Sequence, residues 1–306
     1  MNEVISINPD VLLVGNGINR CYENGVSWDG LLADMSDNYT EEQIKDMQCP
    51  APLKAMLVTK DKAAVRLRNC SDKLSADIKP EQADVMKELL TIGFDDILTT
   101  NYSYEFEAVA LNKENVSDYT LKKIMKHTDE VVKAEPRYLL HTYNAVECER
   151  VYNRIWHIHG ELRKTGSMVL DHYMYINLAS KMKELCNKRG NAYSRNEFTG
   201  KSWIDSFILG DVYILGFGFD LSEVDLWWLL ERKKREISEH GKVVYYNIAD
   251  EEDAKNNKPK LDLLNVLGAK INFLTVKNGD YRSEYEKAIF EIRQCISEKR
   301  RNSNEK

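Results

Sequence analysis

Four short turns in this chain carry glycine, amide or imidazole groups, and each follows an apolar run typical of a buried strand. They are Gly15, Asn16 and Gly17 after DVLLV, Asn101 after DILTT, His159 and Gly160 after RIWHI, and Gly216, Phe217 and Gly218 after DVYIL. Glycine lets the backbone approach a phosphate closely, an amide both donates and accepts hydrogen bonds at a ribose, and histidine titrates near neutral pH. Because ligands of an open parallel sheet bind outside the carboxyl ends of its strands, we expect these turns to line one nucleotide-binding crevice.

Each turn also has a simpler interpretation. A glycine turn after a strand is more often structural than functional, and Asn101 could be an Asx-turn residue. His157 and His159 alternate on one strand, which would place both side chains on one face, where Asp171 or His172 could join them at a metal. We favour a structural role for His157 and a general-base role for His159, because no second pair of metal ligands has suitable spacing.

The elements that must position these turns form an α/β pattern. In the second half of the chain strands alternate with helices at βαβ spacing, which predicts a parallel sheet covered by helices on both faces. Residues 28 to about 92 show only helical periodicity and are interpreted as a helical insertion in a single domain spanning 1–298. Ser222 and Asp225 form a capping pattern before the helix LWWLLERKKREI. The polar end, 299–306, is predicted to be disordered.

The composition argues against several classes of function. The 306 residues carry a net charge of −6 with no basic stripe, which disfavours nucleic acid as a direct partner. The first residues show no secretory pattern and there is no apolar run of about 18 residues, so we expect no membrane association. Six scattered cysteines without a CxxC pair fit reduced thiols and a cytoplasmic location.

Taken together, these residues resemble the sirtuin-like (silent information regulator) family. The closer similarity is to its bacterial branch without a zinc ribbon, which is found in antiviral defence. The matching segments are LLVGNGIN, TTNY, HIHG, LGFGFD and VVYYNIAD, and they run in the family's order between residues 11 and 248. The resemblance implies a Rossmann-like fold without a zinc ribbon that binds NAD as its substrate and needs no metal.

The resemblance also implies a role for each matched residue. Asn101 would orient the nicotinamide ribose and an attacking water, and His159 would be the base that acts on the ribose hydroxyls or on that water. The expected nucleotide-binding residues are Gly15, Asn16 and Gly17 at the phosphates, Gly216 and Gly218 beside them, Asn247 on the adenosine side, and Asn19 and Thr100 within the matched segments.

Departures from the family pattern bear on the activity. Ser103 stands where the family often has aspartate, although Glu105 or Glu107 could supply a carboxylate, and Gly218 stands where a serine is usual. No cysteine quartet follows His159, so protein deacylation is less favoured. A dehydrogenase is less favoured too, because GxGxxG is absent and no acidic residue follows the first glycine turn at the usual distance.

We therefore expect an NAD glycohydrolase that forms ADP-ribose and nicotinamide and acts in bacterial anti-phage defence by depleting NAD. The alternative is a catalytically silent module that binds NAD or ADP-ribose and regulates a partner, and transfer of ADP-ribose to an acceptor is a third possibility. Because an NAD-consuming effector must be held inactive in healthy cells, we expect control by assembly into a homo-oligomer or by a separate sensor or inhibitor protein.

Overall fold

The computed structural model describes residues 8–21, 27–60, 65–66, 80–128, 136–236 and 241–304. The strands are β1 (Asp10–Val14), β2 (Asp96–Thr99), β3 (Met125–His127), β4 (Thr142–Cys148), β5 (Val151–His157), β6 (Asp211–Leu215), β7 (Val243–Ala249) and β8 (Ala269–Thr275). The α-helices are α1 (Trp28–Asp34), α2 (Glu41–Lys45), α3 (Ala51–Thr59), α5 (Pro80–Leu90), α6 (Glu105–Ala110), α7 (Asp118–Ile124), α8 (Arg137–His141), α9 (His172–Ser194), α10 (Trp203–Leu209), α11 (Val224–Glu236), α12 (Glu251–Asn256), α13 (Lys258–Val266) and α14 (Tyr281–Asn304). Two 3-10 helices, η1 (Asn16–Cys21) and η2 (Thr165–Ser167), lie after β1 and β5. None of the helices in these ranges is both long and apolar enough to cross a bilayer.

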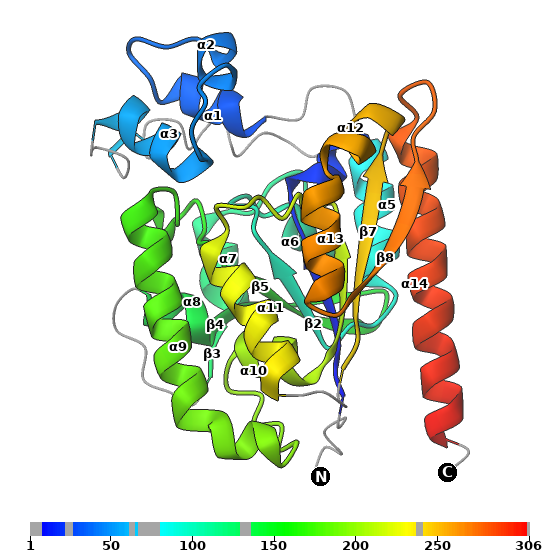
Figure 1. Ribbon diagram of the computed structural model, residues 1–306. Helices are drawn as coiled ribbons and strands as arrows, with labels where there is room; N and C mark the ends of the chain where they lie inside the picture. Colours follow the sequence, from blue (N-terminus) through cyan, green and yellow to red (C-terminus); the bar gives the residue numbers. More distant parts are fainter. Residues whose placement is uncertain are drawn as a thin grey trace.

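In the described part of the chain, eight strands form one sheet in the order β3-β4-β5-β2-β1-β6-β7-β8 (Figure 1). From β5 to β8 every neighbouring pair is parallel, so the carboxyl ends of these strands lie at one edge of the sheet. The chain adds β2 and β5 on one side of β1 and β6, β7 and β8 on the other. The predicted α/β class is therefore confirmed, and β1 marks the point where the strand order reverses.

The sheet is parallel as predicted from β5 to β8, but not at the other edge. β4 pairs with β5 and β3 pairs with β4 in the antiparallel sense, so the sheet is mixed. The β4–β5 hairpin turns at Glu149 and Arg150, which both have positive φ, 47° and 69°. A two-residue hairpin turn needs this backbone conformation, and it usually contains asparagine or glycine. Because neither residue is present here, the sequence does not indicate the hairpin.

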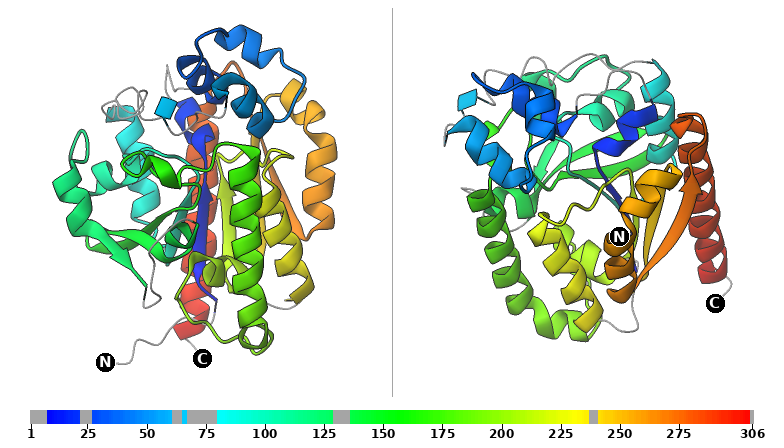
Figure 2. Two further views of the ribbon diagram at one scale, coloured as in Figure 1. Left: turned by 90° about the vertical axis from the view of Figure 1, so that its left-hand side faces the viewer. Right: turned by 45° about the horizontal axis from the view of Figure 1, so that its top comes forward.

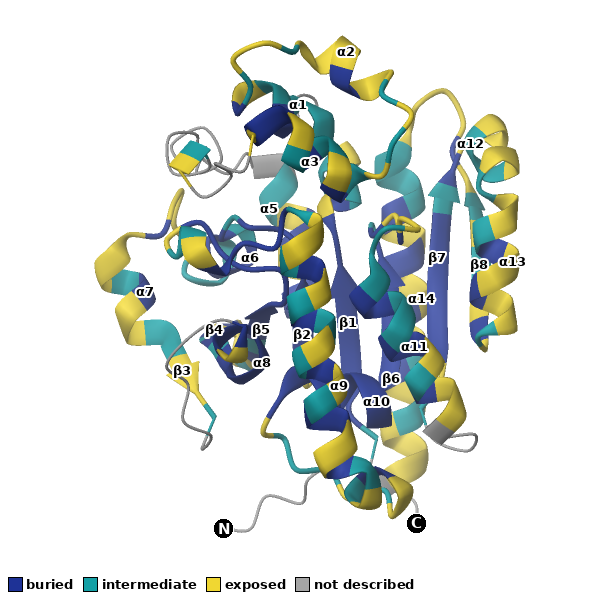
Figure 3. Ribbon diagram, turned by 60° about the vertical axis from the view of Figure 1, so that its left-hand side comes forward, coloured by how far each residue is buried: buried dark blue, intermediate teal, exposed yellow. Residues whose placement is uncertain are grey.

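Alternation along the strands divides the core of the sheet into two clusters. In β1, Val11 and Leu13 belong to one cluster and Leu12 and Val14 to the other, because successive side chains of a strand point to opposite faces. The first cluster includes side chains of α8, α9, α10, α11 and α13, and the second includes side chains of α5, α6 and α14. Figure 3 shows β1 and β7 buried and the outward sides of α9 and α13 exposed.

The helices of residues 28–92 fall into two groups. α1, α2 and α3 lie at the end of the molecule toward which the parallel strands point (Figures 1 and 2). They share an apolar cluster with Tyr102, from the loop after β2, and Leu162, from the loop after β5. α5 instead packs into the second core cluster of the sheet. Among the described residues of this stretch the regular structure is helical. α1 to α3 pack on the loops that carry two of the predicted site turns, those after β2 and β5.

The end of the chain differs from the prediction of a disordered tail. α14 continues through Asn304, so the prediction is wrong for 299–304. Lys299 explains why, because its Nζ lies 2.8 Å from the Asp10 carboxylate at the start of β1 and 2.9 Å from that of Asp211 at the start of β6. Burial opposes the charge on Lys299, but the two carboxylates outweigh it and raise its pKa. These ion pairs hold the last turns of α14 against the sheet.

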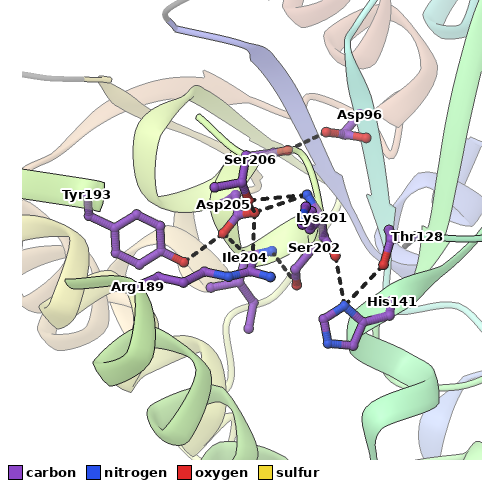
Figure 4. A network of polar contacts seen from close by, with 11 residues as sticks. Asp96, Thr128, His141, Arg189, Tyr193, Lys201, Ser202, Ile204, Asp205 and Ser206 are labelled. Atoms are coloured by element: carbon purple, nitrogen blue, oxygen red, sulfur yellow. Dashed lines mark hydrogen bonds and ion pairs between the residues drawn. The ribbon is translucent and has the colours of Figure 1, made fainter. Parts of the chain in front are cut away.

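Several polar groups at the amino ends of the strands are joined in a network of hydrogen bonds (Figure 4). Asp96, the first residue of β2, accepts hydrogen bonds from Trp156 Nε1 at 2.6 Å and from the Ser206 hydroxyl. Beside it, Asp205 of α10 accepts a hydrogen bond from Arg189 of α9 at 2.6 Å. These contacts join helices to each other and to the sheet, so this edge is a structural anchor.

Candidate functional site

The predicted site turns meet at the carboxyl edge of four neighbouring strands. β5, β2, β1 and β6 are consecutive in the sheet, and the turns that contain His159, Asn101, Gly15 and Gly216 follow them in that order. The two glycine turns are joined directly, since Gly17 N donates to Gly216 O at 2.7 Å. The sheet thus brings together four turns that are widely separated in the sequence.

The two glycine turns pack so closely that side chains would not fit between them. A Cβ on Gly17 would lie 2.5 Å from Gly216 O, and one on Gly15 would lie 2.8 Å from the Phe217 ring. Gly216 also has a φ of 62°, in the left-handed region that favours glycine. Gly218 is different, because nothing lies within 4 Å of a Cβ built on it. Gly218 therefore leaves open space at the edge of the sheet, while the other three are fixed by packing.

Asn101 is held through its backbone, and its side-chain amide is left available. Its N–H donates to Thr99 Oγ1 at 3.1 Å, and its carbonyl oxygen lies 2.9 Å from His157 Nδ1. Asn101 is only 8% exposed, yet Nδ2 has no hydrogen-bond partner among the described residues. A buried donor without a partner costs roughly 1–3 kcal/mol. The Nδ2 amide is therefore a group that a ligand would satisfy.

A buried ion pair fixes the loop that carries Asn101. His157 Nε2 lies 2.9 Å from Glu107 Oε1 on α6, and the same oxygen accepts a hydrogen bond from Asn144 Nδ2 at 2.8 Å. Burial opposes the protonation of His157, but the Glu107 carboxylate outweighs it and raises the pKa of His157 to about 9. His157 is thus an imidazolium that donates to Glu107 and to the Asn101 carbonyl, which agrees with the structural role predicted for it.

His159 lies between two carboxylates. Its Nε2 is 2.9 Å from Asp225 Oδ2, and its Nδ1 is 3.7 Å from Glu223 Oε2. Tyr175 of α9 packs edge-on against the imidazole, with ring centroids 5.3 Å apart. Burial opposes the protonation of His159, but Asp225 and Glu223 outweigh it and raise its pKa. His159 therefore has an acidic partner at each ring nitrogen.

Two predictions about this region are wrong. Asp225 does not cap α11, because the Ser222 N–H donates to Asp220 Oδ1 at 2.8 Å, and the Asp225 carboxylate turns to His159 instead. His157 and His159 do not share one strand face either, because β5 ends at His157 and the strict alternation stops there. Their imidazoles contact acids on different helices, α6 and α11.

The cluster of His159, Glu223 and Asp225 could also hold a cation. One ligand atom from each residue lies within 4.8 Å of the others. The ligands considered from the sequence do not join them, because Asp171 caps α9 and His172 is exposed. Since each ring nitrogen of His159 faces its own carboxylate, a shared proton also satisfies this arrangement.

The other predicted nucleotide-binding residues lie around the same edge. Asn19 is engaged within the fold, since its Nδ2 donates to the exposed Asn16 Oδ1 at 2.7 Å and its Oδ1 accepts from Gln82 Nε2 at 3.0 Å. The Thr100 N–H donates to the last carbonyl of β1 at 3.1 Å. Asn247 is buried near the carboxyl end of β7, the strand beside β6.

The acidic residues that could replace the family aspartate are engaged elsewhere. The Ser103 hydroxyl donates to the Glu105 carboxylate, and burial raises the pKa of Glu105. Glu107 is bound to His157 through Oε1, while its Oε2 has no hydrogen-bond partner among the described residues. Glu107 therefore acts on Asn101 through His157.

The structure adds residues that the sequence analysis missed. Asp225 and Glu223 belong to DLSEVD, which begins two residues after Gly218 of the second glycine turn. Acidic groups just beyond a strand end can indicate a ligand site, but the spacing of Ser222 and Asp225 also fits a helix-capping pattern. Lys260 of α13 had no local indication at all, and its Nζ donates to Gly218 O at 2.6 Å. Burial opposes the charge on Lys260 and lowers its pKa, against the effect of Asp220 and Asp253. Its amino group lies beside the open end of the second glycine turn.

Comparisons with known proteins provide no independent identification. No protein-family model matches the chain, and a search of curated proteins finds no significant match. The resemblance to the sirtuin-like family therefore rests on the matching sequence segments alone.

Proposed function

We propose that this chain is an NAD glycohydrolase that cleaves NAD to nicotinamide and ADP-ribose on a Rossmann-like fold similar to that of the sirtuin-like family. One observation carries the proposal: Asn101, His159 and two glycine turns follow four neighbouring parallel strands at one edge of the sheet. The strand order reverses at β1, and open α/β sheets bind ligands at such a point. The groups at this edge match the needs of a dinucleotide whose bond between ribose and nicotinamide is to be cleaved.

The glycine turns and Lys260 suit the diphosphate of NAD. The contact between Gly17 and Gly216 fixes the two turns, and the open space at Gly218 allows a phosphate to approach the backbone. Lys260 supplies positive charge next to that space. NAD is bound here as a substrate.

Asn101 and His159 suit the nicotinamide ribose. When the bond between ribose and nicotinamide breaks, its electron pair stays on the nicotinamide nitrogen and neutralises that nitrogen. The ribose becomes electron-poor, and the acidic groups around His159 stabilise it. The free Asn101 Nδ2 donates to a ribose hydroxyl, and the water that bonds to the ribose carbon gives its proton to His159.

Variants of the two residues test this assignment. We expect His159→Ala to lower kcat by roughly 10²–10⁴-fold, the usual contribution of a general base, and Asn101→Ala to reduce nicotinamide release severely. The control is His172→Ala, which removes an exposed histidine of α9 and should leave the rate unchanged. Release of nicotinamide is measured by chromatography. Parent rates in both site variants would show that the assignment is wrong.

A second candidate function is a module that binds NAD or ADP-ribose without cleaving it. Two observations favour it: the carboxylates around His159 stabilise its protonated form, which is not a base, and Ser103 is bonded to Glu105 instead of offering a free polar group. Calorimetry would decide between the two. Tight nucleotide binding with no nicotinamide release would support the module.

We also propose a cytoplasmic role in bacterial anti-phage defence by NAD depletion, with the enzyme inactive until it assembles or a separate sensor or inhibitor protein releases it. The resemblance to defence proteins supports this setting, since unrestricted loss of NAD would kill the host. The helices α1 to α3, which pack over the loops after β2 and β5, are where such a contact would change access to the site. A monomer that is fully active at low concentration without a partner would contradict this control.

A further inference from the structure

The buried position of His159 raises the question of how a proton leaves it. The side chains of His159 and Asp225 are 3% and 0% exposed, whereas that of Glu223 is 16% exposed. Glu223 is therefore the member of this three-residue cluster whose side chain is partly exposed, although Oε2, the oxygen that faces His159, is itself buried without a hydrogen-bond partner among the described residues. Its Oε2 lies 3.7 Å from His159 Nδ1. A small movement of the Glu223 side chain would bring the two atoms within hydrogen-bond distance.

The two ring nitrogens of His159 are held differently. Nε2 is bonded to Asp225 at 2.9 Å, a contact that orients the ring and keeps a proton on that nitrogen, as the carboxylate does in catalytic triads. Nδ1 faces Glu223 across a longer gap and is the nitrogen able to take a proton from a reacting water. His157 is arranged otherwise, since its Nδ1 is bonded to the backbone carbonyl of Asn101.

Few other titratable groups face this cluster. Tyr175 on α9 lies against His159 and Glu223, Tyr102 in the loop after β2 lies near Glu223, and Asp220 precedes α11. Burial raises the pKa of both tyrosines, so they stay neutral at physiological pH. Burial and the nearby Asp225 and Asp220 raise the pKa of Glu223, against the effect of His159, to about 7. A carboxyl group with a pKa near 7 can both accept and release a proton at physiological pH.

We propose that Asp225 is the positioning residue of His159 and that Glu223 is the group through which the proton taken up by His159 reaches solvent. This proposal rests on the function proposed above. In the step concerned, the water oxygen bonds to the ribose carbon as the bond to nicotinamide breaks, and the electron pair of that broken bond stays on nicotinamide. The water proton moves to His159 Nδ1, then to the Glu223 carboxylate, and finally to solvent, so one proton is released for each NAD.

The pH dependence of kcat tests the role of Glu223. His159 acts as a base only when Nδ1 is unprotonated, and a neighbouring carboxylate favours the protonated form. Glu223→Gln should therefore move the acidic limb of the profile to lower pH by about one unit. It should also lower the plateau rate by roughly tenfold or more, because His159 becomes a weaker base and no longer has Glu223 to accept its proton. Glu223→Asp should restore part of the rate, and Glu231→Gln, on the exposed side of α11, should change neither.

Asp225→Asn tests the positioning role. An asparagine amide at this place can donate to Nε2 and so favour the tautomer with the proton on Nδ1, which cannot act as a base. We expect kcat to fall by about 10²–10⁴-fold with KM little changed. If kcat fell only in proportion to the amount of folded protein, so that kcat per folded molecule stayed at the parent value, this role would be overturned.

A measurement without NAD separates this proposal from the proposed function. Imidazole nitrogens are followed by NMR over a pH series in protein with labelled histidine, and the His159 signals are identified by their loss in His159→Gln. The midpoint of His159 should fall by about one unit in Glu223→Gln and stay at the parent value in Glu231→Gln. An unchanged midpoint in both Glu223→Gln and Asp225→Asn would overturn the proposal even if NAD is cleaved. A shifted midpoint in a protein that never cleaves NAD would contradict only the proposed function.

Discussion

At the scale of single residues, the neighbours of an imidazole decide its role here. His157 has one carboxylate, from Glu107, and one backbone carbonyl, from Asn101, so it is a fixed donor at both nitrogens. His159 has a carboxylate at each nitrogen, and the side chain of one of the two acids, Glu223, is partly exposed. Within the segment HIHG, the only feature that favours His159 as the reactive histidine is its position next to Gly160. The acids that separate the two roles come from α6 and α11, so local sequence alone does not show them.

The His157 ion pair predicts a loss of stability at alkaline pH. Its pKa of about 9 in the folded protein lies above the ordinary value of 6.5. Its contribution is therefore fully present below pH 6.5 and is lost as the pH rises through 9. Over this interval, the free energy of unfolding of the parent protein should fall by on the order of 3 kcal/mol relative to that of His157→Gln. Urea unfolding at closely spaced pH values measures the difference between the two proteins.

Comparison with the variant removes the contributions of other groups that titrate in the same range, such as Lys233, whose pKa burial lowers to about 7. A difference between parent and His157→Gln that stays constant from pH 6 to pH 10 would refute the buried imidazolium.

At the scale of elements, the strands and their glycine turns could be predicted from the sequence, but the antiparallel pairing and the long-range contacts of the elements could not. β1, β6 and β7 are apolar runs buried along most of their length, so their sequences indicate strands directly. The β4–β5 hairpin was missed because Glu149 and Arg150 adopt positive φ without the usual turn residues. The lengthening of α14 depends on Asp10 and Asp211, at the starts of β1 and β6, and local composition does not indicate such tertiary contacts.

The glycine turns predict opposite results for two similar substitutions. Gly17→Ala places a Cβ 2.5 Å from Gly216 O, so it should destabilise the fold by about 1–3 kcal/mol and weaken NAD binding. Gly218→Ala meets nothing within 4 Å, so stability should change by less than about 0.5 kcal/mol. Thermal unfolding and NAD binding measured on both variants test this. If Gly218→Ala lost stability and left NAD binding intact, the open space at Gly218 would not be a phosphate site.

At the scale of the whole molecule, the two edges of the sheet differ in how well their polar groups are satisfied. At the amino edge Asp96 and Asp205 are bonded by several side chains (Figure 4). At the carboxyl edge Asn101 Nδ2, Glu107 Oε2 and Asp225 Oδ1 are buried without a hydrogen-bond partner among the described residues. Buried polar groups are normally paired. Asn153 Oδ1 near the start of β5 is unpaired too, so what distinguishes the carboxyl edge is that three unpaired groups gather around Asn101 and His159.

This division predicts that stability and activity can be changed separately. Arg189→Met leaves Asp205 buried and without its cation, 2.6 Å away in the parent, which should cost about 3–5 kcal/mol of stability. The NAD turnover of the molecules that remain folded should be unchanged, because the pair lies at the edge opposite the site. Lys188→Met, which breaks an exposed ion pair with Glu184 on the same helix, should cost less than about 1 kcal/mol.

Chemical unfolding and turnover per folded molecule are compared for the two variants. A specific loss of turnover in folded Arg189→Met would show that the amino edge is not merely an anchor.

The measurement that tests the central claim most directly is product analysis by mass spectrometry. NAD is incubated with the purified protein over a series of protein concentrations, with Asn101→Ala alongside. The account predicts nicotinamide and ADP-ribose in equal amounts with the parent protein and intact NAD with Asn101→Ala, and a threshold concentration would indicate activation by assembly. Equal product formation by the parent protein and Asn101→Ala would contradict the assigned site, and NAD left intact by the fully assembled parent protein would contradict the hydrolase itself.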